Sequence, residues 1–432
     1  MDLKTELEVE LTANILPYWI NKMQDRENGG FYGRIDGNEI IHQNANKGAI
    51  LNARILWTFS AAYRLLKNPA YLEMAERAYQ YLTEYFMDSK DGGVFWELDF
   101  LGNPVNTKKQ TYAQGFALYG LSEYYRATGR PAALEQAKML FFLIERHCHD
   151  QQTGGYFEAF TRNWRPIDDM RLSEKDANEK KTMNTHLHIL EPYTNLMRIW
   201  KSPGIKHAQR NLISIFTDKI LNSDTNHLQL FFDENWNCKS TAISYGHDIE
   251  ASWLLVEAAE LLGDQALTEQ IKNISLKIVD AASEGLQPDG SMIYEKRFNN
   301  STIQQFKDSK IQQFNNSMES LNGEALTEGN HGIIESLNHG IMESWNDRHW
   351  WVQAEAVVGL MYAWKNSGNM LYRENAQKAW DYIRRQIIDA VNGEWYWSRL
   401  ADGQANLHDD KAGFWKCPYH NGRMCMEIMV NG

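Results

Sequence analysis

The stretch "ENGGFYGRID", residues 27–36, decides the fold of this chain because variants of it return along the sequence. Each copy is a turn signal followed by alternating aromatic and polar residues, a pattern that predicts a small β-hairpin. Three of the glycines, Gly30, Gly93 and Gly155, lie 63 and 62 residues apart. A fixed period of this kind indicates a repeat architecture. The other copies are "KDGGVFWELD" (90–99), "QTGGYFEAFT" (152–161), "PDGSMIYEKR" (288–297), "VNGEWYWSRL" (391–400) and a weaker one, "NHLQLFFDEN" (226–235).

Pairs of helical stretches separate the hairpins, as residues 49–68 and 71–88 separate the first from the second. Apolar residues recur in these stretches at spacings of three and four, and glycine or proline marks their ends. With an N-terminal helix and a final helical stretch at 416–430, we expect about twelve helices in six pairs.

Six helix pairs with short connections predict an all-α fold, an (α/α)6 barrel with short β-hairpins in its connecting loops. We expect one catalytic domain over residues 1–432. An open solenoid of the same pairs is the alternative. Closure is favoured because the last helix has no partner after it and the first helix precedes every hairpin, so the two complete a pair if the ring shuts.

Residues 299–345 break the repeat. They are rich in Asn, Gln and Ser and contain internal copies such as "STIQQF" and "SKIQQF". This composition is typical of an inserted low-complexity loop without a catalytic role. A lid over a substrate is the alternative interpretation.

Charge and cysteine content exclude several classes of protein. The formal net charge is −12, which disfavours binding to nucleic acid or an anionic membrane. No window reaches the roughly 18 apolar residues of a membrane helix, and the N-terminus lacks the pattern of a signal peptide. The four scattered cysteines form no CxxC pair, which indicates reduced thiols and a cytoplasmic protein.

Aromatic residues make up 12% of the chain and include 15 Trp. A large helical core explains part of this content. A sugar site explains it as well, because apolar pyranose faces stack on indole and phenol rings while hydroxyls meet polar groups.

Polar residues recur near the start of the stretches expected to form the inner helices. Spacings of three or four place such residues on one helix face, and the equivalent ends should meet at one mouth of the barrel. Each residue has a structural interpretation, but buried His, Glu and Arg are costly unless they are paired. The residues are Arg54, Tyr112, Asn184, His188, His247, Glu250, Trp351, Glu355 and, in the last helix, His420.

Other chemistries have weaker signals. A metal site built from His188, His247, Glu250 and His420 is conceivable, but no HExxH motif occurs and we expect no metal. A P-loop, a GxGxxG motif after a strand and a GxSxG nucleophile motif are also absent from the sequence.

Several motifs together resemble the N-acylglucosamine 2-epimerase superfamily and, within it, the cellobiose 2-epimerases. The resemblance covers the chain except residues 299–345. The motifs are "NARILW" with Arg54, "TYAQGFALYGLSEYY" with Tyr112, "NTHLHILEPYT" with Asn184 and His188, "YGHDIEASWLL" with His247, Glu250 and Trp253, "WWVQAEA" with Trp350 and Trp351, and "FWKCPYHNGRMCMEI" with Trp415 and His420.

The resemblance implies an (α/α)6 barrel and a reaction without metal or other cofactor. It implies inversion at C2 of the reducing-end glucose of a β-1,4-linked disaccharide, converting cellobiose to glucosyl-mannose and lactose to epilactose. The disaccharide is the expected partner. We expect a monomer, with a homodimer as the alternative.

The chemistry of the side chains gives a hypothesis for each role. The sugar ring must open before C2 becomes acidic, and two imidazoles suit the proton transfers because their pKa lies near working pH. We expect His247 and His420 to act on opposite faces of C2, Arg54 and His188 to stabilise the enediolate, and Glu250 to orient His247 or another ring nitrogen. The residues expected to bind the sugar are Tyr112, Asn184, Trp253, Trp350, Trp351, Trp415 and Glu355.

Other functions remain open from the sequence. An aldose–ketose isomerase uses the same enediolate, and an N-acylglucosamine 2-epimerase shares the scaffold. A glycoside hydrolase needs two carboxylates beside the scissile bond, for which Glu250 and Glu355 are candidates. A sugar-binding protein without activity explains the aromatic residues but not three histidines at one mouth.

Overall fold

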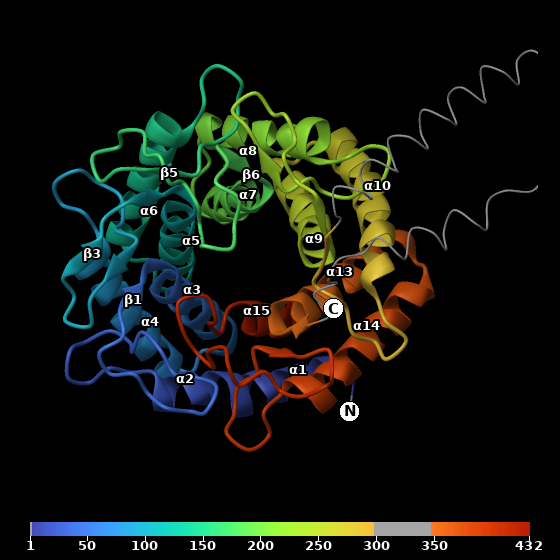
Figure 1. Ribbon diagram of the computed structural model, residues 1–432, viewed down its shortest axis with the longest axis horizontal. Helices are drawn as coiled ribbons and strands as arrows, with labels where there is room; N and C mark the ends of the chain where they lie inside the picture. Colours follow the sequence, from blue (N-terminus) through green and yellow to red (C-terminus); the bar gives the residue numbers. More distant parts are fainter. Residues whose placement is uncertain (1, 298–346) are drawn as a thin grey trace, which may run out of the picture.

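The helices form two concentric rings (Figure 1). The computed structural model describes residues 2–297 and 347–432. The N-terminal helix runs through α1 (Leu3–Val9), a π-helical stretch (Glu10–Ile15) and α2 (Leu16–Lys22). The inner ring consists of α3 (Ala49–Leu66), α5 (Thr111–Thr128), α7 (Met183–Ile199), α9 (Tyr245–Leu262), α13 (Trp350–Ser367) and α15 (His420–Asn431). The N-terminal helix, α4 (Pro69–Tyr81), α6 (Pro131–Leu143), α8 (Pro203–Ile215), α10 (Gln265–Ala282) and α14 (Met370–Tyr382) cover it.

The inner ring is closed. Each inner helix packs against the next, from α3 to α5, α7, α9, α13 and α15, and α15 packs against both α3 and α1. Two indole hydrogen bonds join the N-terminal helix to the hairpin at 391–400. Trp19 Nε1 donates to Glu394 Oε2 at 2.6 Å, and Trp395 Nε1 donates to Glu10 Oε1 at 2.7 Å. The predicted (α/α)6 barrel is therefore confirmed, and the open solenoid is excluded.

The helix ends follow from local sequence. Three outer helices begin with proline at their first position, at Pro69, Pro131 and Pro203, where no backbone N–H is needed. Inner helix α5 ends at Gly129 in the left-handed conformation (φ 71°), which glycine adopts without steric cost. The connections between paired helices are therefore short, and each pair lies antiparallel.

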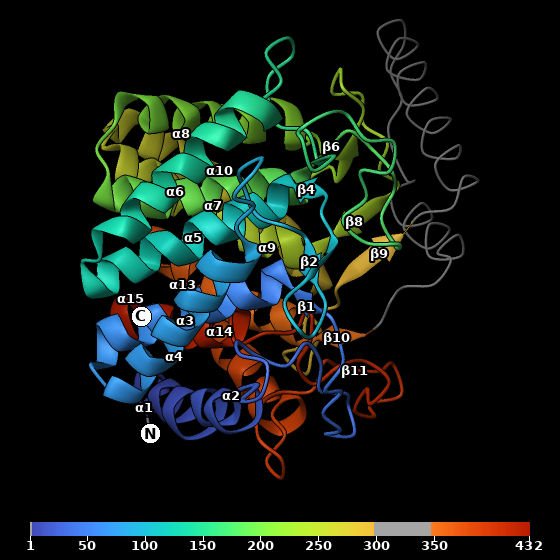
Figure 2. The same cartoon turned by 90° about the vertical axis from the view of Figure 1, so that its left-hand side faces the viewer.

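Short antiparallel strand pairs lie together at one end of the barrel (Figure 2). The strand that enters an inner helix pairs with a strand from a later hairpin, so the N-termini of α3, α5, α7, α9 and α13 share this end. The strands are β1 (Lys47–Gly48), β2 (Glu97–Leu98), β3 (Pro104–Asn106), β4 (Lys109–Gln110), β5 (Ala159–Phe160), β6 (Lys181–Thr182), β7 (Phe231–Phe232), β8 (Ala242–Ser244), β9 (Glu295–Arg297), β10 (Arg348–His349) and β11 (Ser398–Arg399).

The weak copy at 226–235 also forms a hairpin. Its Leu221 and Leu228 are bridged in antiparallel fashion. Asn226 has φ 59°, a left-handed conformation that glycine supplies in the stronger copies, such as Gly154 with φ 75°. Asparagine tolerates this region better than most residues, which explains why the turn survives the substitution.

Buried ion pairs fasten the hairpins to the inner ring. The lysine lies on the segment leading into an inner helix and the aspartate lies at the hairpin turn. Lys47 and Asp25 are joined at 2.8 Å with both side chains fully buried. The related pairs are Lys109–Asp88 at 2.9 Å, Lys181–Asp150 at 2.8 Å and Lys411–Asp389 at 2.5 Å.

We expect Lys47→Met to lower the free energy of unfolding by about 3–5 kcal/mol, because it leaves the Asp25 carboxylate buried without its cation. Chemical denaturation measures the change. The exposed Lys90 gives a matched control, and Lys90→Met should change stability by less than about 0.5 kcal/mol. Equal stability of the two variants would show that the buried pair contributes nothing.

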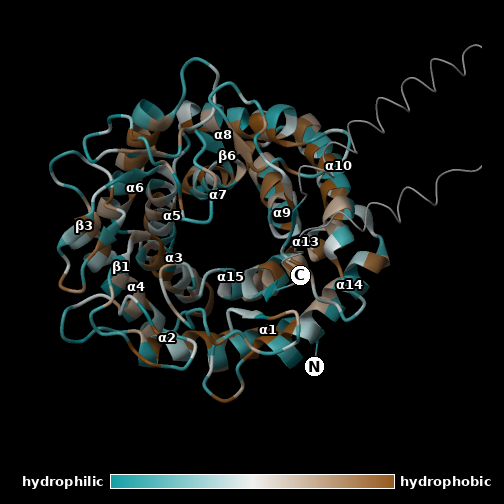
Figure 3. Ribbon diagram, viewed as in Figure 1, coloured by the Kyte–Doolittle hydropathy of each residue, from teal (hydrophilic) through white to brown (hydrophobic). Residues whose placement is uncertain are grey.

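The hydropathy pattern agrees with a protein that faces water on its outside. Hydrophilic residues colour the loops and outer faces, and hydrophobic residues colour the helix faces between the rings (Figure 3). Among the described residues, no helix combines the length and hydropathy needed to cross a bilayer. The predicted inserted loop at 299–345 lies outside the described residues.

Candidate active site

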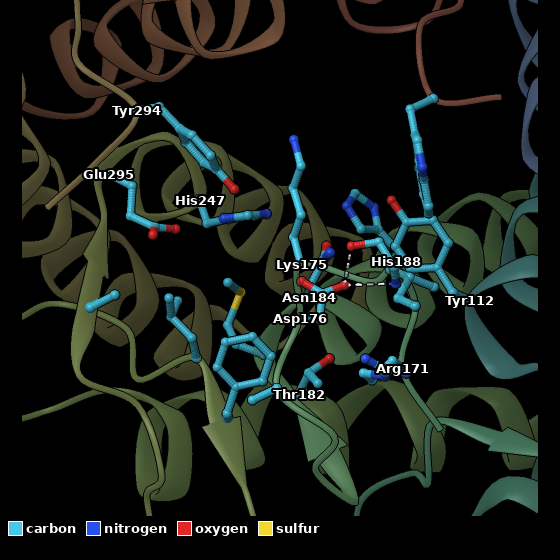
Figure 4. Close-up of a pocket in the computed structure, with 18 of the residues that line it drawn as sticks. Tyr112, Arg171, Lys175, Asp176, Thr182, Asn184, His188, His247, Tyr294 and Glu295 are labelled. Carbon is cyan, nitrogen blue, oxygen red and sulfur yellow. Dashed lines mark hydrogen bonds between the residues drawn. The ribbon is translucent and has the colours of Figure 1, made fainter. Parts of the chain in front are cut away.

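A cavity of about 680 Å³ opens at the strand-bearing end of the barrel. Ten of the twelve residues predicted for the site line it, while Trp253 and Glu355 do not. Figure 4 shows Asn184, His188 and His247 around one space, with Tyr112 and Tyr294 on opposite sides. The ten are Arg54, Tyr112, Asn184, His188, His247, Glu250, Trp350, Trp351, Trp415 and His420.

The repeat explains why these residues meet. Arg54, His188, Glu250 and Glu355 are each the sixth residue of their inner helix, so they lie at one level of the barrel. The residues two positions before the last three, His186, Asp248 and Gln353, accept from backbone N–H groups of the hairpins instead, as Gln114 does at the same position of α5. His186 is one of them, since its Nε2 accepts from the Tyr156 N–H at 2.9 Å. Of the two neighbouring histidines in α7, His186 is therefore structural and His188 faces the cavity.

Arg423 of α15 lies behind the residues that line the cavity. Its Nη2 donates to Glu250 Oε1 at 2.7 Å and to Glu355 Oε1 at 2.6 Å. Its Nη1 donates to Glu191 Oε1, which also accepts from the Tyr419 hydroxyl. Burial alone would raise the pKa of Glu191, but Arg423 and His188 lower it to about 2.

Carboxylates orient two of the three predicted catalytic histidines. His420 Nδ1 lies 2.7 Å from Glu355 Oε1, and His188 Nδ1 lies 3.1 Å from Glu191 Oε2. Both rings therefore keep Nε2 for other contacts. Burial lowers the pKa of both imidazoles, and that of His420 falls well below the ordinary value. Both rings are neutral at neutral pH.

His247 is held differently. Its Nδ1 lies 2.7 Å from the Ser244 hydroxyl, which caps α9. Burial lowers the pKa of His247 to about 3. The Trp351 ring lies 4.9 Å from the His247 ring and 5.6 Å from the His420 ring, between centroids. Trp351 therefore packs against both neutral imidazoles.

The buried guanidinium of Arg54 is surrounded by aromatic side chains. Its Nη2 donates to the Tyr112 hydroxyl at 2.8 Å, and the guanidinium carbon lies 4.2 Å from the centre of the Phe116 ring. Among the described residues, no carboxylate lies within ion-pair distance of Arg54, although its side chain is almost fully buried. The site thus holds a cation that lacks an anionic partner.

Of the two carboxyl groups that share Arg423 Nη2, Glu250 is the one that lines the cavity. Burial raises its pKa to about 8. Glu355 accepts from Arg423, Trp253 and His420, whereas Glu250 accepts from Arg423. Hydrogen bonds favour the charged form of the group that accepts them. Burial raises the pKa of Glu355 as well, but its additional hydrogen bonds favour its charged form, so Glu250 is the more readily protonated of the two carboxyl groups.

Three predictions need correction. For Glu250, the part of the prediction that named His247 is wrong, because Ser244 holds that ring. The alternative, that Glu250 orients another ring nitrogen, stays a prediction, since Glu250 lies 3.8 Å from His420 Nδ1 and 4.0 Å from His188 Nε2. Glu355 lies behind His420 and supports it instead of contacting the cavity. Trp253 also lies behind the site, where its indole donates to Glu355 at 3.0 Å.

Sequence reasoning missed Glu191, Arg423, Ser244 and Tyr419. Glu191 and Arg423 each follow a predicted histidine by three positions, so the same helical spacing contained a signal for them. Ser244 lies three residues before His247, as a helix-capping serine does. The loop between β5 and β6 also lines the cavity with residues 171–177, and no repeat marks it.

The residues do not favour a metal ion at the centre. Glu250, Glu355 and His420 form a group whose ligand atoms lie close enough to hold one. However, the Arg423 guanidinium already lies between the two carboxylates and supplies the positive charge there. A second cation would be repelled at this distance.

The closed barrel and its cavity define an (α/α)6-barrel enzyme. The N-acylglucosamine 2-epimerase family model matches residues 30–422. The chain belongs to this family and is an epimerase, an enzyme of the isomerase class.

Individual relatives agree with this assignment. A cellobiose 2-epimerase of Bacteroides fragilis is 53% identical over 427 residues, covering 99% of this chain and 98% of the relative. A cellobiose 2-epimerase of Ruminococcus albus is 38% identical over 429 residues, covering 99% and 98%. The solved cellobiose 2-epimerase of Bacillus thermoamylovorans has a TM-score of 0.85 at 38% identity and covers 99% of each chain. The resemblance noted from the motifs is confirmed.

Proposed function

We propose that the enzyme inverts C2 of the reducing-end glucose of β-1,4-linked disaccharides, converting cellobiose to glucosyl-mannose and lactose to epilactose. The observation that carries the proposal is the pair of neutral imidazoles, His247 and His420, which both line the cavity and both pack against Trp351. The names of the relatives support the substrate class. The cavity volume of about 680 Å³ supports a ligand larger than one sugar ring.

The reaction begins with ring opening. A proton leaves O1, a proton reaches O5, and the resulting C1 carbonyl acidifies the C2–H bond. His188 suits the first transfer, because its Nδ1 is bonded to Glu191 and its neutral ring accepts a proton at Nε2. Glu250, which carries a proton and faces the cavity, suits donation to O5.

Epimerisation then replaces the proton on one face of C2 with a proton on the other. One neutral imidazole takes the C2 proton, which leaves an enediolate. The other imidazole takes up a proton from water and delivers it to the opposite face of C2, and the proton on the first imidazole then passes to water. His247 and His420 fill these two roles, and the roles exchange in the reverse reaction. Arg54 stabilises the negative charge on O1 and O2 by charge-assisted hydrogen bonds.

The aromatic residues hold the sugar. Trp350, Trp351 and Trp415 line the cavity and offer ring faces for stacking. Asn184 has a buried Oδ1 without a hydrogen-bond partner among the described residues, which suits a sugar hydroxyl. Tyr112 holds Arg54 and lies against Trp415 at 6.1 Å between ring centroids.

The enzyme in this proposal acts without cofactor, as a monomer in the cytoplasm, with one catalytic domain over residues 1–432. Histidine acid–base catalysis supports the independence from a cofactor. The four cysteines are free, which suits a reducing compartment.

Proton NMR of cellobiose incubated with the enzyme and EDTA in D₂O tests the function. We expect glucosyl-mannose with deuterium at C2. Glucosyl-fructose would assign the enzyme to the aldose–ketose isomerases instead. Release of glucose would indicate a glycoside hydrolase, which the site disfavours because Glu250 and Glu355 bind one guanidinium nitrogen and Glu355 lies outside the cavity.

A further inference from the structure

One buried guanidinium links three buried carboxylates from three different helices. Arg423 of α15 contacts Glu191 of α7, Glu250 of α9 and Glu355 of α13. Each of these four side chains is at most 3% exposed. The Arg423 guanidinium also lies 4.8 Å from the Trp253 ring and 4.4 Å from the Tyr419 ring, which hold it in place.

Two of the three carboxylates in turn hold an imidazole. Glu355 is bonded to His420 Nδ1, and Glu191 is bonded to His188 Nδ1. Arg423, Glu191 and Glu355 do not line the cavity, whereas His188 and His420 do. The arginine therefore contacts each histidine through a carboxylate and does not reach the substrate.

We propose that Arg423 is a positioning residue that keeps Glu355 and Glu191 ionised and thereby fixes both His420 and His188 with the proton on Nδ1. An ionised carboxylate accepts the Nδ1–H bond, so the lone pair lies on Nε2, the nitrogen left for substrate. For catalysis, this inference rests on the function proposed above. The tautomers themselves do not depend on it.

Removal of Arg423 reverses this arrangement. Buried carboxylates without a cation take up protons, because burial disfavours their charged form. A protonated Glu355 donates to Nδ1 of His420, and the imidazole proton then moves to Nε2. In that tautomer His420 cannot accept a proton from C2, since its accepting nitrogen faces Glu355.

Other charged groups also surround His420, and the effect of Arg423 must be distinguished from theirs. Arg54 and His188 both disfavour a charged His420, and Glu191 favours it. None of these three contacts the Glu355 carboxylate in the described part of the chain. The groups around His420 are Arg54 from α3, His188 and Glu191 from α7, Glu250 from α9, Glu355 from α13 and Arg423 from α15.

Long-range proton–nitrogen NMR of the full chain with ¹⁵N-labelled histidine, without substrate, tests the inference. The spectra report which ring nitrogen carries the proton. His188→Gln and His420→Gln variants assign the two signals. The wild type should show Nδ1–H for both rings, and Arg423→Met should move the proton of His420 to Nε2. Unchanged tautomers in Arg423→Met would overturn the proposal.

Arg198→Met is the matched control, because Arg198 forms an ion pair with Glu257 at 2.5 Å away from both histidines. It should leave the tautomers unchanged. If Arg423→Met does not fold, Glu355→Gln gives the second test, since it removes the charge beside His420 alone. It should alter the His420 signal and leave that of His188 unchanged, and an unaltered His420 signal would overturn the proposal.

Kinetics separate positioning from general loss of structure. We expect Arg423→Met to lower kcat by about 10- to 100-fold with little change in KM, as for other residues that orient a reacting group. Activity should recover partly as pH rises and Glu355 ionises, whereas a structural defect lowers activity equally at every pH. If the wild type shows the expected tautomers but does not epimerise cellobiose, the proposed function is contradicted and this inference stands.

Discussion

His247→Ala and His420→Ala are each expected to lower the turnover of cellobiose by about 10²- to 10⁴-fold, the range of general acid–base catalysis. Inversion requires proton removal on one face of C2 and proton return on the other, so neither histidine replaces its partner. The substitutions remove an imidazole that lines the cavity and should leave the fold intact.

Isotope exchange distinguishes the two histidines. In D₂O, a variant that lacks the returning acid can still exchange the C2 proton of the starting sugar without forming an epimer. A variant that lacks the base for that sugar does neither. NMR of the recovered sugar therefore assigns each face of C2 to one histidine, and near-normal turnover in either variant would contradict the assignment. The exposed His207 provides the control, and His207→Ala should retain full activity.

The pH dependence follows from the burial of both rings. Burial lowers the pKa of His247 to about 3 and lowers that of His420 well below the ordinary imidazole value of about 6.5. Because the catalytic base must be neutral, kcat/KM should stay level as pH falls through 6.5. The unfolded chain binds these protons below about pH 6.5 and the folded chain does not, so stability should fall there. An acidic limb at or above pH 6.5 would contradict the neutral, buried pair.

The closed barrel and ten of the residues that line the cavity could be predicted from the sequence, because the helix pairs repeat. Arg54, His188 and Glu250 occupy the same position in three of the inner helices, so aligning the helix ends was enough to place them together. The N-terminal helix and α15 lack hairpin neighbours on one side, and their contact closes the ring.

The distance of a residue from the mouth of the barrel was harder to predict than the helix face on which the residue lies. Trp253 follows Glu250 by three residues and lies on the same helix face, but it is almost one turn farther from the mouth. Periodicity gives the face of a helix and not the level at which the cavity ends. The pairing of Glu355 with His420 joins residues 65 positions apart, which local spacing does not reveal.

Arg54→Ala is expected to lower kcat by about 10²- to 10³-fold, corresponding to about 3–4 kcal/mol for the loss of a donor to a developing oxyanion. The guanidinium is almost fully buried and is held by Tyr112 and Phe116 without a nearby carboxylate among the described residues. Such a charge is costly in the free enzyme. The negatively charged enediolate would supply the anion that pairs with the Arg54 guanidinium.

A second variant at this position, Arg54→Met, offers an independent measurement. Arg54→Met keeps most of the side-chain volume, removes an unpaired buried charge and should raise the melting temperature while kcat falls. A structural arginine behaves in the opposite way, because its removal lowers stability. Tyr112→Phe, which removes the hydroxyl bonded to Arg54 and keeps the ring, should lower kcat less than loss of the charge does. Unchanged kcat in Arg54→Met would remove Arg54 from the intermediate, whereas opposite changes in stability and turnover would identify a charge kept for the reaction at the expense of stability.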